Sequence, residues 1–355
     1  MATENHPFNS MTRAMRVIIL IMILSVIGCG GTEDTLRRKI NETTSLTRAT
    51  ISTGSVITVP FTLHDQLILV KGRVNGYQTE RLFVFDTGAS VTVINPPVAS
   101  ELGIEGFGSI ESPHTAGSLS PEKKFEFARI NEISIGKAEV TNCLAVIIDT
   151  SALEIQNINA DGIIGASFFG YMRTEINYRT RTITFSDPRS PEDPSIARYS
   201  TPMKENGMID CIIDNEVTLR GIIDTAAPRT VIPYSRVKDI PGLTFLQIRG
   251  TGEYTLTGAN TGAESGLTSI GSLSIAGTTL KHTAVTAMND GSVNSAVIGY
   301  DVLSAFRIIL NYASHTVILV PYDTDAVMRK FFSFGFETVL KSNRFEVARV
   351  IASFP

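Results

Sequence analysis

Cysteine, histidine and basic charge are all scarce in this chain of 355 residues, and each scarcity excludes a class of protein. The five scattered histidines and three cysteines show no zinc-binding spacing, no disulfide framework and no arrangement typical of a serine or cysteine triad. A net charge of −4 provides no clustered basic surface for nucleic acid. We therefore expect no metal, no cofactor and no nucleic-acid partner. Cys143 and Cys211 are expected to be separate buried thiols, although an oxidising compartment would also allow them to pair.

Long apolar runs are missing as well. Arg13 and Arg16 precede the uncharged sequence VIILIMILSVIG, which ends before Cys29 and is shorter than the roughly 20 residues that a membrane span requires. A charged start, a short apolar middle and a small residue at Gly28 are typical of a secretory signal. The sequence VIGC also resembles the lipobox of bacterial lipoproteins, in which the cysteine becomes the lipidated first residue.

This resemblance implies that residues 1–28 are a lipoprotein signal peptide and that Cys29 carries the lipid. The chain would then be located in the cell envelope, outside the cytoplasm, and would contact the membrane only through its lipid. The alternative is an uncleaved membrane anchor with an incidental cysteine.

Composition divides the rest of the chain into segments. A polar stretch rich in Thr, Arg and Asn has no apolar period, which predicts a tether, and the proline-containing sequence DPRSPEDPS predicts a linker. The predicted boundaries are a tether at 29–54, a first lobe at 55–187, a linker at 188–198, a second lobe at 199–321 and a C-terminal tail at 322–355.

The tail offers two interpretations. Phe334-Gly335-Phe336 and the strand-like run Arg344–Ile351 faintly resemble the opening of a PDZ domain. The alternative is a strand that packs on the body of the protein, because so short a piece cannot bury a core by itself.

The chain carries one passage twice, about a domain's length apart. VFDTGASVTVIN and IIDTAAPRTVIP, aligned on Asp86 and Asp224, share Asp-Thr, an alanine and then Thr-Val-Ile. In each half a strand-like run, a turn at Asn75-Gly76 or Asp214-Asn215, and a returning run lead into the aspartate. This register indicates a duplicated unit with each aspartate at the end of a buried strand.

The repeat continues beyond the aspartates. The first half has NEISIG, DGIIGASFF and a closing strand at Ile176–Phe185, and the second half has GSLSIAG, SAVIGYDVL and a closing strand at Leu310–Leu319. Many short strands and few helical periods predict two all-β lobes.

The ordered motifs resemble those of the retropepsin-type aspartic proteases. Asp86-Thr87-Gly88-Ala89 with Ile163-Ile164-Gly165 matches in the first half, and Asp224-Thr225 with Val297-Ile298-Gly299 matches in the second. The resemblance implies two β-barrel lobes related by a pseudo-twofold axis and a polypeptide substrate. Since both halves belong to one chain, a monomer is expected.

The resemblance makes Asp86 and Asp224 the catalytic pair. Hydrolysis of an amide by water needs one group to accept a proton and another to donate one. In aspartic proteases two carboxyl groups about 3 Å apart share a single proton and provide both roles.

Other residues receive supporting roles by the same resemblance. Thr87 and Thr225 would interlock beneath the carboxyl groups, Gly88 and Ala226 would adjoin them, and the apolar-apolar-Gly segments would pack against the aspartate loops. Glycine-bearing flaps would hold an extended substrate, and the alternative is that these segments are ordinary hairpin tips. The supporting residues are Thr87, Gly88, Thr225, Ala226, Ile164, Gly165, Ile298 and Gly299, and the flap residues are Ala116, Gly117, Gly258 and Ala259.

The second motif departs from the family pattern: Ala226 stands where glycine is usual, and Pro228 stands where the first copy has Ser90. If position 226 needs a positive φ, alanine costs about 1–2 kcal/mol. If instead its methyl group presses on the carboxyl pair, catalysis could fail. The alternative function is then a catalytically impaired homologue that acts as a peptide-binding module.

Overall fold

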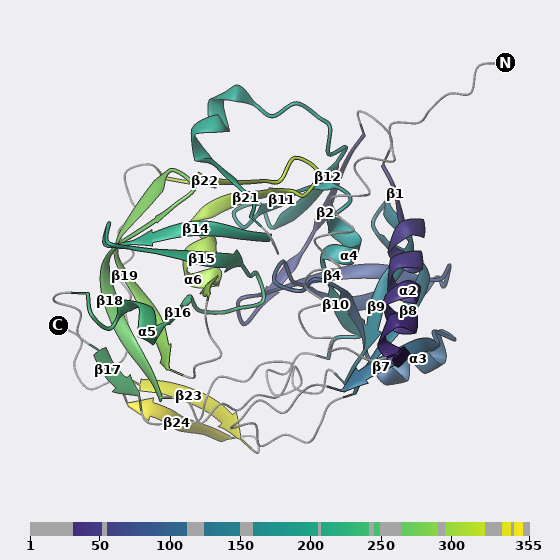
Figure 1. Ribbon diagram of the computed structural model, residues 1–355, viewed down its shortest axis with the longest axis horizontal. Coiled ribbons are helices and arrows are strands. Elements are labelled where there is room, and N and C mark those ends of the chain that lie inside the picture. The colour runs from purple at the N-terminus through teal and green to yellow at the C-terminus, as the bar shows by residue number, and fades with distance from the viewer. Residues whose placement is uncertain are drawn as a thin grey trace.

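The chain forms two β-lobes in the computed structural model shown in Figure 1. The structure describes residues 31–51, 55–111, 124–149, 159–204, 207–240, 245–248, 264–289, 295–323, 336–341 and 344–350. The expected signal peptide, the lipidated Cys29 and the four flap residues lie outside these ranges.

The first lobe is a closed barrel of six strands. Its strands in spatial order are β4 (Leu67–Val74), β5 (Arg81–Phe85), β10 (Gly162–Ile164), β6 (Thr92–Ile94), β9 (Ala138–Ile147) and β8 (Lys124–Ile135), and β8 pairs with β4 to close the circle. The pairs β5–β10 and β6–β9 are parallel and the others are antiparallel. β1 (Arg48–Thr50), β3 (Thr62–His64) and β7 (Gly106–Glu111) extend this sheet.

The second lobe repeats this arrangement. Its barrel runs through β14 (Met208–Ile213), β15 (Val217–Ile223), β20 (Ala296–Ile298), β16 (Val231–Pro233), β19 (Thr278–Asn289) and β18 (Glu264–Ile275), which pairs with β14. Here β15–β20 and β16–β19 are the parallel pairs, and β17 (Phe245–Ile248) extends the sheet. Two closed, mixed barrels confirm the predicted all-β class and its duplication.

A third sheet joins the lobes. Its order is β13 (Ser200–Pro202), β22 (Thr316–Pro321), β21 (Phe306–Asn311), β11 (Arg173–Asn177), β12 (Thr182–Ser186) and β2 (Val56–Pro60). Strands β11 and β21, one from each half, pair in the middle of it. The single closing strands expected at Ile176–Phe185 and Leu310–Leu319 were wrong. Each segment turns back as a hairpin, and these hairpins connect the lobes instead of closing the barrels.

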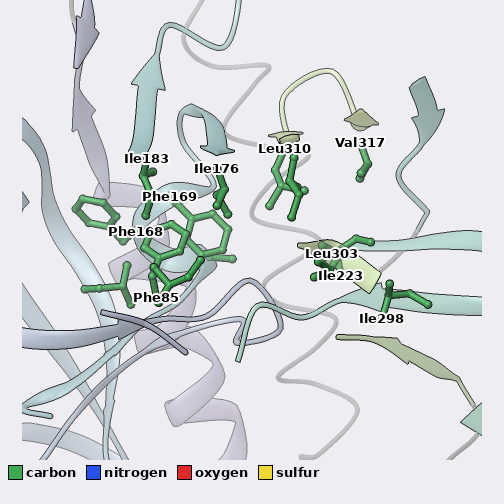
Figure 2. Close-up of a cluster of buried hydrophobic side chains, with 14 of the residues drawn as sticks. Phe85, Phe168, Phe169, Ile176, Ile183, Ile223, Ile298, Leu303, Leu310 and Val317 are labelled. Carbon is green, nitrogen blue, oxygen red and sulfur yellow. The ribbon is translucent and has the colours of Figure 1, made fainter. Parts of the chain in front are cut away.

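The apolar core continues from one lobe into the other (Figure 2). Phe85 packs on Phe169 with ring centroids 5.1 Å apart, and both side chains are fully buried. Ile223 and Ile298 hold the equivalent strands of the second half. Truncating one buried phenylalanine to alanine typically costs about 3–5 kcal/mol, so this core fixes the ends of β5 and β15 firmly.

Within the described ranges, four short helices follow strands of the barrels. They are α3 (Pro96–Glu101) and α4 (Ala166–Phe169) in the first half, and α5 (Tyr234–Val237) and α6 (Tyr300–Leu303) in the second. The matching positions of α4 and α6, each directly after an apolar-apolar-Gly segment, repeat the duplication seen in the strands.

The expected tether was wrong for residues 31–50. Helix α2 (Gly31–Leu46) packs on the first lobe, and β1 pairs antiparallel with β9 (Figure 1). Leu36 and Ile40 are buried against the apolar side chains of Phe127, Leu144 and Val146. The helix stays on the barrel because these two residues remove apolar surface from water.

The linker is also ordered against the body. Its 3₁₀ helix η2 (Pro194–Tyr199) is capped by Asp193, whose side chain accepts a hydrogen bond from the Ser195 N–H group at 2.9 Å. Glu192 binds the guanidinium of Arg173 in β11 through three contacts of 2.9–3.2 Å.

Strands β23 (Phe336–Lys341) and β24 (Arg344–Val350) form a two-stranded antiparallel sheet in the tail, so a hairpin stands where one packing strand was the alternative. Whether this hairpin belongs to a PDZ-like unit stays a prediction. Cys143 and Cys211 are free and buried. Within the described ranges, no helix has both the length and the apolar character that crossing a membrane requires.

Candidate active site

The two aspartates occupy equivalent positions at the ends of central barrel strands. Asp86 follows β5, and its N–H group donates to the carbonyl of Ile164 at 3.0 Å. Asp224 follows β15, and its N–H group donates to the carbonyl of Ile298 at 3.0 Å. Because each strand is held by a parallel neighbour up to its last residue, both side chains leave rigid backbone.

Threonine side chains interlock the two loops. The Thr87 N–H group donates to the Thr225 hydroxyl at 3.1 Å, and the Thr225 N–H group donates to the Thr87 hydroxyl at 3.1 Å. The Thr87 hydroxyl in turn donates to the carbonyl of Ile223 at 2.6 Å, and the Thr225 hydroxyl donates to that of Phe85 at 2.8 Å. Both threonines are buried, so the four bonds are shielded from water.

Each carboxyl group is oriented by its own loop. Oδ1 of Asp86 accepts from the N–H groups of Gly88 at 2.7 Å and Ala89 at 3.2 Å. Oδ1 of Asp224 accepts from those of Ala226 at 2.8 Å and Ala227 at 3.0 Å. The two carboxyl groups lie close enough together for each to shift the pKa of the other.

Burial and proximity favour a shared proton. Burial raises the pKa of Asp86 well above its ordinary value, and the adjacent Asp224 carboxylate raises it further, against the opposing effect of the Gly88 N–H group. Burial also raises the pKa of Asp224, while the N–H groups of Ala226 and Ala227 and the adjacent Asp86 carboxyl group oppose this rise. The pair therefore retains a proton at a pH where an exposed aspartate is ionised.

The glycines of the apolar-apolar-Gly segments allow close approach behind both loops. A Cβ atom at Gly165 would lie 2.3 Å from the Val91 carbonyl oxygen, and one at Gly299 would lie 2.5 Å from that of Arg229. The residues after these glycines then hold the loops: the Ala166 N–H group donates to the Ala89 carbonyl, and that of Tyr300 donates to the Ala227 carbonyl, both at 2.8 Å.

Sequence reasoning missed a polar layer behind the loops. In the first half, the Thr92 hydroxyl accepts from the Ser167 hydroxyl at 3.0 Å. In the second half, the Thr230 hydroxyl accepts from the Gly299 N–H group at 3.1 Å and donates to Asp301 at 2.7 Å. The available signal was the shared Thr-Val-Ile of the two passages, since Thr92 and Thr230 are that threonine.

Two tyrosines lie near the aspartates. Burial raises the pKa of Tyr178, and the negative charge of Asp224 adds to the rise. Burial likewise raises the pKa of Tyr312, with a contribution from Asp86. The Tyr178 hydroxyl oxygen is buried and has no hydrogen-bond partner among the described residues.

Ala226 is not strained. Its φ is not positive, and neither is that of Gly88, so the conformational cost considered for an alanine at this position does not arise. Space is the relevant quantity. A Cβ atom at Gly88 would lie 2.7 Å from Cγ and from Oδ2 of Asp224.

The structure thus brings the predicted pair and all eight supporting residues into one place at the seam of the lobes. The flap residues lie outside the described ranges. Within those ranges, no group of three or more His, Cys, Asp or Glu side chains is placed to hold a metal ion.

Comparison with known proteins agrees with this geometry. The model of one family, described as aspartyl protease, matches residues 70–168 and 209–302, which contain most of the first and the second barrel. No curated protein matches the chain. Because the matched segments cover more than half of its residues, the chain belongs to the aspartyl protease family.

Proposed function

We propose that this protein is an aspartic endopeptidase that hydrolyses peptide bonds of a polypeptide substrate with a water molecule activated between Asp86 and Asp224. The observation that carries the proposal is the close approach of two carboxyl groups at the seam, one from each half and each oriented by two N–H groups of its own loop. The threonine interlock supports it, because its four bonds keep the two loops in register.

The chemistry requires one ionised and one protonated carboxyl group. The ionised group takes a proton from water, whose oxygen forms a bond to the peptide carbonyl carbon. The protonated group gives its proton to the carbonyl oxygen, so a neutral tetrahedral intermediate forms. The C–N bond then breaks: the first carboxyl group returns its proton to the departing amine nitrogen, and the second carboxylate takes a proton from one hydroxyl of the intermediate, whose oxygen becomes the new carbonyl oxygen. The pair ends with one proton, as it began.

A peptide-binding module without turnover is the second candidate. Ala226 favours it, because the equivalent position in the first half has no room for a methyl group beside the opposite aspartate. This candidate predicts affinity for extended peptides and no cleavage.

Cleavage of an unfolded protein distinguishes the two candidates. The full chain is incubated with the substrate from mildly acidic to neutral pH, beside Asp86→Asn and Asp224→Asn variants and an Asp239→Asn control at an exposed site. We expect the control to keep activity and each dyad variant to lose at least about 100-fold, since each lacks one proton-transferring group. Intact substrate in every reaction, together with measurable peptide binding, would favour the binding module.

We also propose that Cys29 is lipidated, that the protein is anchored in the cell envelope, and that it acts as a monomer. The residues VIGC support the first two, and the presence of both aspartates in one chain supports the third. Loss of membrane association in a Cys29→Ala variant tests the anchor, and sedimentation of the detergent-solubilised chain tests the monomer.

A further inference from the structure

The first half shows how closely one aspartate loop approaches the opposite carboxyl group. At Gly88 a Cβ atom would lie 2.7 Å from both Cγ and Oδ2 of Asp224, and 3.1 Å from its Oδ1. Real Cβ atoms do not approach other heavy atoms so closely. The hydrogen at Gly88 is therefore what allows Asp224 its present position.

Ala226 is the equivalent residue in the second half. Its N–H group binds Oδ1 of Asp224 at 2.8 Å, as that of Gly88 binds Oδ1 of Asp86 at 2.7 Å. The threonine bonds across the seam are matched in the same way, at 3.1 Å in both directions. The pseudo-twofold axis therefore directs the Ala226 methyl group toward Asp86.

Apolar packing agrees with this direction. Ala226 packs with an apolar cluster that otherwise belongs to the first half. The cluster includes Ala89, which lies in the Asp86 loop, and Val84, which lies in the strand before it. The methyl group of Ala226 thus reaches across the seam to the side on which Asp86 lies. Gly88 has no methyl group that could reach toward Asp224.

We propose that the methyl group of Ala226 makes the two carboxyl groups unequal, so that Asp86 keeps the shared proton and Asp224 is the ionised partner that takes the proton from water. This assignment rests on the proposed function for its catalytic meaning and deepens it by naming the role of each aspartate.

The physical cause is desolvation on one side only. A methyl group beside a carboxyl group excludes water and offers no hydrogen bond, which disfavours the charged form. Consistently, the pKa of Asp86 is raised well above its ordinary value, chiefly by burial, and Asp86 is the more buried of the two side chains.

The other ionisable groups near the pair do not provide this asymmetry. Tyr312 lies near Asp86 and Tyr178 lies near Asp224, so each carboxyl group has one tyrosine. Asp301 and Arg229 occur only in the second half, and their opposite charges act on each other.

Titration of the two carboxyl groups tests the assignment without any substrate. The full chain is labelled with ¹³C at the aspartate Cγ atoms, and their resonances are followed from about pH 3 to 9, with Asp86→Asn and Asp224→Asn variants for assignment. We expect Asp224 to ionise at lower pH than Asp86. The reverse order, or ionisation of both at one pH, would overturn the inference.

Variants at position 226 test the cause. Ala226→Gly removes the methyl group, and Ala226→Ser keeps the β-carbon but adds a hydroxyl that can donate to an ionised Asp86. Both variants should reduce the difference between the pKa values of Asp86 and Asp224 by about one pH unit or more. Ala197→Gly, which removes a methyl group from an exposed site in η2, should leave this difference unchanged. An unchanged difference in either folded variant at position 226 would refute the role of the methyl group.

Cleavage provides a second readout that separates this inference from the proposed function. Activity that needs Asp224 ionised and Asp86 protonated has a bell-shaped pH profile. The width of this profile equals the pKa difference between the two groups, so Ala226→Gly should make the profile narrower. If the protein cleaves substrate but the pKa difference between the two aspartates is the same in Ala226→Gly, the proposed function stands and the inference is wrong. If that difference changes in a protein that cleaves no substrate, the inference stands and the proposed function is wrong.

Discussion

Thr87 and Thr225 bind each other across the seam of the two lobes, and each hydroxyl both accepts from the other's N–H group and donates to the last carbonyl of the opposite strand. Every polar group in this interlock is satisfied away from water. Its geometry couples the position of one aspartate to that of the other, because the threonines directly follow Asp86 and Asp224.

Removal of one hydroxyl should therefore be costly. In Thr87→Val the Thr225 N–H group loses its acceptor and the Ile223 carbonyl loses its donor. We expect a loss of about 1–3 kcal/mol for each buried group left without a partner, measured by denaturant unfolding. Cleavage should fall as well. Thr87→Ser, which keeps the hydroxyl, should stay near the wild type, and equal losses in both variants would contradict the role of these bonds.

The raised pKa of Asp86 predicts how stability depends on pH. Between the ordinary pKa of an aspartate, about 3.9, and the raised folded pKa, the folded chain holds a proton that the unfolded chain has released. The contribution of this group to stability is fully present below the unfolded pKa and is lost as the pH rises through the folded pKa. Each pH unit of this window costs about 1.4 kcal/mol.

The Asp86→Asn variant has no carboxyl group to titrate at this position, so it does not lose this contribution to stability as the pH rises. Its free energy of unfolding, compared with that of the wild type, should rise steadily with pH once the pH exceeds about 4. Asp239→Asn, at an exposed position, should run parallel to the wild type. The check is a series of urea unfolding curves at several pH values. Parallel curves for Asp86→Asn would show that the aspartate is not held in its neutral form.

Gly165→Ala tests the close approach behind the first aspartate loop. Its Cβ atom would lie 2.3 Å from the carbonyl oxygen of Val91 and 2.9 Å from that of Ala89, so backbone has to move. We expect a loss of about 3 kcal/mol and loss of cleavage. Gly221→Ala is the matched control, because its Cβ atom would meet only side-chain atoms, at 3.3 Å or more, and the cost should be smaller. Similar losses in both would argue against this role for the Val91 and Ala89 carbonyls.

Helix α2 should contribute to the stability of the first lobe. Leu36→Ala and Ile40→Ala each remove a buried side chain and should cost about 2–4 kcal/mol by thermal or denaturant unfolding. Asn41→Ala, on the exposed side of the same helix, serves as the control and should change stability little. If all three variants unfold alike, the helix does not stabilise the lobe in solution.

The sequence was informative wherever one residue type is required at one place. The doubled Asp-Thr passage and the apolar-apolar-Gly segments predicted two barrels and the residues that meet at their seam. Gly165 shows the reason: only glycine leaves room for the Val91 carbonyl, so the residue type by itself indicates a close approach of backbone.

Features that depend on combinations of residues were not predicted. Thr43 and Thr44 complete the buried face of α2, and Thr47 is buried just after it. The hydroxyls of Thr44 and Thr47 donate to backbone carbonyls within the fold, so polar residues stand at buried positions and composition suggested a polar tether. The turn between β11 and β12 has a positive φ at Arg181, a position where no glycine indicates a turn in the sequence. Asp301 escaped notice because its counterpart in the first half is Ser167, a different residue type.

Because β11 and β21 pair across the two halves, separating the halves would leave each of these strands without its partner from the other half. Cut between the halves, each fragment would expose an unsatisfied edge of N–H and C=O groups where its neighbour had been. Such an edge invites another strand, so an isolated half should associate with a copy of itself or precipitate. Covalent fusion of the halves thus gives each edge a partner at a fixed, high local concentration, which favours pairing within the chain over self-association.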